Sequence, residues 1–162
     1  MTSAQWKAAV EWYDAAVAEV YAHRDPKGEV VKDERLAPAR EALAEAAAAF
    51  DLFEPATPQQ RVDRLHNLVW VAAWQTWIAR TLGEAQGHAA AGLAYLTDLR
   101  SVSPADQDKL AYLRPRFVAV LDTPGPKADL APAWGANFLT APQSRGALWL
   151  WIGGGILWLL RR

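Results

Sequence analysis

Cysteine is absent from the 162-residue sequence, and methionine occurs only once. The lack of thiols excludes disulfides, thiolate metal sites, iron–sulfur clusters and cysteine nucleophiles. An excess of basic charge is also missing, because 17 Lys and Arg residues face 18 Asp and Glu residues. Proteins that bind nucleic acid usually carry a basic excess or a basic stripe. We therefore expect no nucleic-acid partner.

Catalytic signatures are missing as well. The sequence has no glycine-rich phosphate loop with its lysine, no serine nucleophile elbow and no zincin motif. The acidic pairs Glu11 with Asp14 and Glu41 with Glu45 fall on polar helix faces, where solvation explains them. We expect a protein that is not an enzyme, with no cofactor and no bound metal.

The first residues lack the pattern of a signal peptide, which needs a basic start followed by an uninterrupted apolar stretch. Residues 1–21 instead mix Lys7, Glu11, Asp14 and Glu19 with apolar residues. We expect the bulk of the chain to lie in the cytoplasm.

Apolar residues at helical spacing dominate residues 1–122. Their steps of three and four place them on one face of successive helices. Thr2, Thr57 and Ser103 have the position of N-terminal caps before three of these segments. The segment that follows Thr57 is apolar almost all round as far as Ala79, which predicts the centre of a bundle. The fold class we expect is all-α, a small bundle of about five helices over residues 1–122.

Glycine and proline set the boundaries of the last two expected helices. Gly83 has the residue type of a C-terminal cap for the third helix, so the fourth helix is expected from about Ala85 to Val102. The fifth helix is expected to start at Ser103 and to be kinked or shortened by Pro115.

Residues 123–139 contain several Pro and Gly residues that interrupt any period, and we expect them to form a linker. Trp134 and Phe138 stand late in this segment, where a linker is normally polar. We expect both side chains to lie beside a membrane.

Residues 146–160 form a run of 15 residues without one polar side chain. A helix from about Pro142 to Arg162 would be roughly 31 Å long, close to the ~30 Å hydrocarbon core of a bilayer. Arginines at both ends of the run can reach the headgroups. We therefore expect residues 140–162 to form a single C-terminal membrane-spanning helix, with membrane lipid as its partner.

The same tail offers a surface to a second helix. Three consecutive glycines expose bare backbone, against which a helix of another membrane protein subunit could pack, while tryptophans near the two ends suit the aromatic belts of a bilayer. The residues expected to anchor the tail and to pack against a second helix are Arg145, Trp149, Trp151, Gly153, Gly154, Gly155, Trp158, Arg161 and Arg162.

A helical bundle with one C-terminal span resembles, in layout only, the tail-anchored adaptors of the tetratricopeptide-like kind. The family's period of about 34 residues is missing, so no residue role is carried over. The function we expect is that of a membrane-anchored accessory subunit or adaptor. Two alternatives stay open: a soluble helical scaffold whose apolar tail is buried by oligomerisation, and a metal-dependent bundle enzyme using Asp63 and His66. A tail helix lying flat in the membrane interface is a further possibility for residues 140–162.

Overall fold

The computed structural model describes residues 3–23, 34–135 and 138–140. These ranges contain no β-strand, so the expected all-α fold is confirmed for the described part of the chain. The elements in chain order are α1 (Ser3–Ala22), the 3-10 helix η1 (Glu34–Leu36), α2 (Ala37–Asp51), α3 (Pro58–Ile78), α4 (Leu82–Val102), α5 (Pro104–Leu110), the 3-10 helix η2 (Ala111–Leu113) and α6 (Arg114–Leu121).

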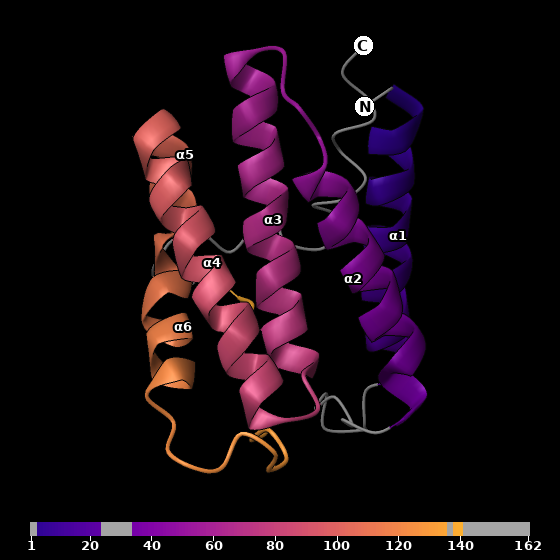
Figure 1. Cartoon of the computed structure of the whole chain (residues 1–162), viewed down its shortest axis with the longest axis vertical. Coiled ribbons are helices and arrows are strands. Elements are labelled where there is room, and N and C mark those ends of the chain that lie inside the picture. Colours follow the sequence, from indigo (N-terminus) through magenta and orange to yellow (C-terminus); the bar gives the residue numbers. More distant parts are fainter. Residues whose placement is uncertain (1–2, 24–33, 136–137, 141–162) are drawn as a thin grey trace, which may run out of the picture.

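Helices α1 to α5 form an up-and-down bundle in which each helix packs against its neighbour in sequence (Figure 1). Helix α3 lies between the α1–α2 pair and α4, while α5 and α6 pack on α4. Helices α5 and α6, joined by η2, together take the place of one fifth helix. The prediction of a helical bundle of about five helices is therefore confirmed.

Helix α3 is the centre of the bundle, as its sequence predicted. Its start is fixed by Thr57, whose Oγ1 accepts a hydrogen bond from the Gln60 amide (3.2 Å), and by Pro58 in the first turn. Beyond Leu65 nearly all of its apolar side chains are buried, and Trp74 and Trp77 keep only 4% and 3% of their surface exposed. This burial is what a helix without a broad polar face requires.

Small residues set the packing of α1 on α2. Ala9 and Ala16 of α1 and Ala39 and Ala46 of α2 are all buried. Side chains of this size let two helix backbones approach closely.

The boundary expected between the third and fourth helices was wrong. Gly83 does not cap α3, because α4 already begins at Leu82. Its N-terminal cap is Thr81, whose hydroxyl accepts a hydrogen bond from the Glu84 amide while the Glu84 carboxylate accepts one from the Thr81 amide. This reciprocal capping box satisfies two helix-end amides, and it outweighs the tendency of glycine to end a helix.

Pro115 divides the fifth helical segment, as expected. Helix α5 ends at Leu110, η2 tightens the chain, and α6 then starts with Pro115 in its first turn, where its missing N–H costs nothing.

Substitution by alanine at two glycines of α4 should change the free energy of unfolding in opposite directions. A Cβ at Gly92 would lie 2.5 Å from the Phe117 ring, whereas a Cβ at Gly87 would meet nothing within 4 Å. Gly92→Ala should lower the free energy of unfolding by about 1–3 kcal/mol, because the buried ring must move. Gly87→Ala should raise it by about 0.5–1 kcal/mol, because alanine favours the helix.

Urea unfolding followed by far-UV circular dichroism measures both values. Equal effects of the two substitutions would contradict the close packing of α4 on α6.

Candidate functional site

Most residues of the predicted membrane anchor lie outside the described ranges, since Arg145, Trp149, Trp151, Gly153, Gly154, Gly155, Trp158, Arg161 and Arg162 all follow Thr140. Within those ranges no helix has both the length and the apolar content that a bilayer crossing needs. Trp134 and Phe138 are described, and they lie on the bundle. The segment that carries them, residues 123–135 and 138–140, is called the return segment below.

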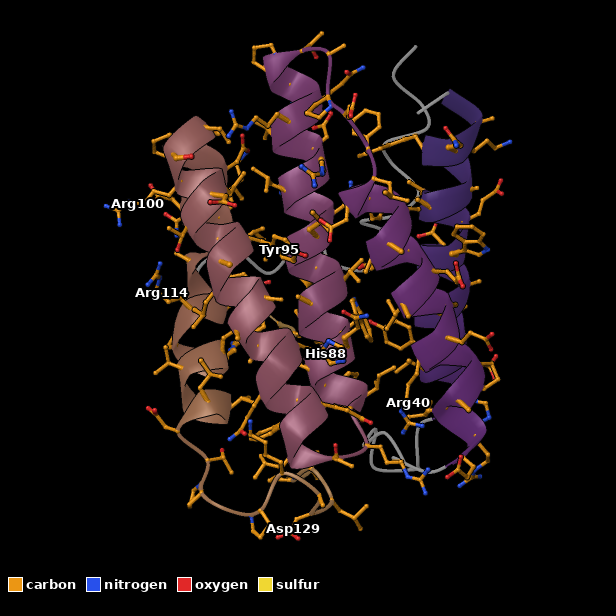
Figure 2. All side chains as sticks on the ribbon, in the orientation of Figure 1. Arg40, His88, Tyr95, Arg100, Arg114 and Asp129 are labelled. Atoms are coloured by element: carbon orange, nitrogen blue, oxygen red, sulfur yellow. The ribbon has the colours of Figure 1, made fainter. Side chains whose placement is uncertain are left out.

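The return segment runs back along the start of α4. The amides of Leu82 and Gly83 donate to the carbonyls of Asp129 (2.8 Å) and Lys127 (2.9 Å), and the Ala131 amide donates to the Arg80 carbonyl (2.9 Å). Figure 2 shows Asp129 in this segment, below the start of α4. These bonds supply acceptors for first-turn amides that a helix leaves without partners. The proline- and glycine-rich segment expected to be a linker is therefore bonded to the bundle.

Gly83 allows the return segment to approach the start of α4 closely. A Cβ on Gly83 would lie 2.9 Å from the Lys127 Cβ and 3.0 Å from the Lys127 carbonyl oxygen. Only a residue without a side chain lets the return segment come this close. The glycine that suggested a helix end thus marks the place where two stretches of backbone meet.

Farther along, the return segment contributes aromatic side chains to the bundle surface. The Trp77 indole N–H donates to the Trp134 carbonyl (2.9 Å). The Phe138 ring is 8% exposed and lies with its centroid 6.3 Å from that of Phe117 and 6.2 Å from that of Trp134. Both residues expected to lie beside a membrane are thus positioned by contacts with α3 and α6.

Arg116 and Tyr112 hold the last described residues. The Arg116 guanidinium donates to the carbonyls of Phe138 (2.5 Å) and Thr140 (2.7 Å), and the Tyr112 hydroxyl donates to the Leu139 carbonyl (3.3 Å). The guanidinium carbon also lies 4.9 Å from the centroid of the Tyr112 ring, a cation–π contact. We call Tyr112 and Arg116 the exit clamp, since they fix the chain just before the apolar tail.

Burial shifts the titration of both clamp residues toward the neutral form. It raises the pKa of the Tyr112 hydroxyl to about 12 and lowers the pKa of Arg116. Arginine stays charged over the physiological range all the same, and the neutral Tyr112 hydroxyl keeps its proton. Both groups therefore remain hydrogen-bond donors to the carbonyls of residues 138–140.

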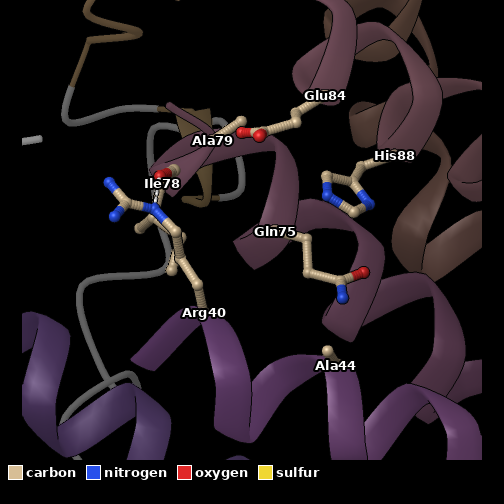
Figure 3. A pocket seen from close by; sticks show the side chains of 7 residues that line it. All are labelled: Arg40, Ala44, Gln75, Ile78, Ala79, Glu84 and His88. Carbon is tan, nitrogen blue, oxygen red and sulfur yellow. Dashed lines mark hydrogen bonds between the residues drawn. The ribbon is translucent and has the colours of Figure 1, made fainter. Parts of the chain in front are cut away.

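A separate small cavity of about 260 Å³ lies where α2, α3 and α4 meet, and its polar lining residues are Arg40, Gln75, Glu84 and His88 (Figure 3). The Arg40 Nε donates to the Ile78 carbonyl (2.9 Å), and the Glu84 carboxylate belongs to the capping box of α4. Burial lowers the pKa of His88. The cavity is below the range of about 300–1,000 Å³ typical of ligand pockets, and Arg40 and Glu84 have structural roles.

The metal-dependent enzyme considered above needs a cluster of metal ligands. In the described ranges, no three His, Cys, Asp or Glu side chains come together to form one. The His66 Nε2 accepts a hydrogen bond from the Trp70 indole (3.2 Å), and burial lowers the pKa of His66. The Asp63 carboxylate accepts one from the Gln59 side-chain Nε2 (2.8 Å). The two residues proposed as ligands are thus engaged with different partners.

Sequence reasoning missed Arg116, Tyr112 and Trp77, which hold the return segment. They stand 22 to 57 residues from their partners along the chain, so no local spacing pairs them. The available signal was the pair of aromatic residues, Trp134 and Phe138, in a segment that is otherwise rich in proline and glycine.

Comparison with protein families, with curated proteins and with solved structures finds no match for this chain.

Phe138→Ala tests whether the return segment contributes to the stability of the bundle. Removing a ring that is 92% buried should lower the free energy of unfolding by about 2–4 kcal/mol. Leu130→Ala is the matched control, because Leu130 is 76% exposed in the same segment, and its effect should stay within about 0.5 kcal/mol. Both are measured by urea unfolding of the full chain in mild detergent. Two equally small effects would mean that the segment is an independent linker in solution.

Proposed function

We propose that the protein is a membrane-anchored adaptor or accessory subunit without catalytic activity, which holds a rigid helical bundle beside a membrane protein complex. The C-terminal residues 140–162 would insert as a single helix, with membrane lipid and another membrane subunit as partners and the bundle on the cytoplasmic side.

The observation that carries this proposal is the exit clamp. Arg116 and Tyr112 bind the backbone of residues 138–140 to α6 and η2, and the run of 15 apolar residues begins only six positions after Thr140. An apolar tail that leaves from a fixed point on a folded surface holds that surface at a short, defined distance from the bilayer. Such geometry suits a protein that presents a binding surface, which needs no catalytic residues.

The three glycines of the tail favour the proposal that the tail has a protein partner in the membrane. Gly153, Gly154 and Gly155 weaken a helix by about 1 kcal/mol each relative to alanine, so the insertion free energy of the tail is modest. Contact with a second helix through this bare backbone would add stability that lipid alone does not provide.

A charge in the middle of the tail tests the proposal. The five Leu and two Ile residues of the run contribute about −2 to −4 kcal/mol to insertion, and one central Arg costs about 2.5–3.5 kcal/mol. The full chain should stay in the membrane fraction after alkaline carbonate extraction, and Gly154→Arg should be largely released. Gly135→Arg is the control, because Gly135 is exposed with open space around it, and this variant should remain with the membranes.

Release of the unaltered chain by carbonate would contradict the proposal. If the released protein is a defined oligomer by light scattering, the soluble scaffold becomes the better explanation of the apolar tail.

A further inference from the structure

We infer that one flank of the bundle, formed by η2, α6 and the end of the return segment, faces the lipid headgroups of the bilayer that the tail enters. We call it the exit face and define it by Tyr112, Arg116, Ala119, Trp134 and Thr140. The inference rests on the proposed function and adds an orientation to it: the bundle lies with its side, rather than with one of its ends, toward the membrane.

The chain between the exit clamp and the apolar run is short. Thr140 is fixed to Arg116, and Arg145, which directly precedes the apolar run, is only five positions farther along the chain. Five residues of fully extended chain span at most about 18 Å. The bilayer surface must therefore lie close to the exit clamp.

The exit clamp lies on the side of the bundle, away from both ends. Arg116 lies in the first turn of α6, and Figure 1 shows that this turn lies beside the middle part of α4, not at either end of the bundle. Helix α3 alone is roughly 31 Å long from its 21 residues. A tail that leaves from the middle of one flank brings that flank to the bilayer and leaves α2, on the opposite flank (Figure 1), farther away.

The exit face carries half-buried side chains that combine an apolar body with a polar group. Tyr112 has a ring with a hydroxyl and Arg116 a long apolar stem with a charged head, while Trp134 contributes ring surface, since its indole nitrogen is buried. These residue types concentrate where hydrocarbon meets water. The nearby charges on α5 are mixed, because Lys109 is paired with Asp106 (2.6 Å) and Asp108 is exposed. The face therefore suits a zwitterionic headgroup layer and does not need anionic lipid.

The absence of cysteine allows a direct test with single spin labels on the full chain. Ala119→Cys places a label on the exit face, and Ala48→Cys places one on α2; both alanines are exposed within helices. The labelled proteins are bound to phosphatidylcholine vesicles that contain a nickel-chelating lipid. We expect headgroup-bound nickel to relax the label at 119 several-fold more strongly than the label at 48. An equal or reversed effect in vesicle-bound protein would overturn the inference.

The role of the clamp is tested in the same experiment. Arg116→Gln should bring the ratio between the two labels toward one, because the chain is no longer fixed before the tail. Arg114→Gln should leave the ratio unchanged, since Arg114 points away from residues 138–140 and contacts Thr97 of α4 (3.4 Å). A ratio that Arg116→Gln leaves unchanged in a folded protein, as judged by circular dichroism, would contradict the role of the clamp.

Vesicle flotation separates the two ways in which the idea can fail. If the labelled chains do not float with the vesicles, the proposed function fails, and the inference fails with it. If they float and the ratio is one, membrane anchoring stands and only the orientation is wrong.

Discussion

Three indole N–H groups on α3 donate hydrogen bonds, and two of their acceptors lie on other parts of the chain and so tie the bundle together. Trp74 donates to the Tyr13 hydroxyl of α1 (2.9 Å), Trp77 to the Trp134 carbonyl of the return segment, and Trp70 to His66 on its own helix. A buried donor without an acceptor would cost about 1–3 kcal/mol. The tryptophan-rich helix therefore determines more than the volume of the core, because it requires polar partners from α1 and from the chain beyond α6.

The link from α3 to Trp134 connects the core to the proposed function. It places the return segment against the bundle, where the backbone bonds of Leu82, Gly83 and Ala131 and the exit clamp hold it at further points. These hydrogen bonds and the burial of Phe138 make the described residues of the return segment part of the folded unit. A membrane helix that continues from such a segment would orient the bundle rather than merely tether it.

Local patterns predicted the helices well. The spacing of apolar residues, the caps Thr57 and Ser103, and the break at Pro115 all correspond to features of the structure. The predicted start of α4 was wrong because Gly83 was interpreted as the end of the preceding helix, although the sequence from Thr81 to Glu84 has the pattern of a capping box. The clamp could not be predicted, because Arg116 meets Phe138 and Thr140 only after α6 and the return segment have folded onto the bundle, and no periodicity encodes that pairing.

Amide hydrogen exchange of the full chain bound to phosphatidylcholine vesicles tests the account most directly. The account predicts strong protection in peptides that cover residues 146–160, because lipid excludes water from them, together with bundle-like protection of the Leu82, Gly83 and Ala131 amides, whose acceptors lie across the contact of α4 with the return segment. Exchange of residues 146–160 at the rate of an unstructured peptide in vesicle-bound samples would contradict the central claim that the bundle is anchored through its tail.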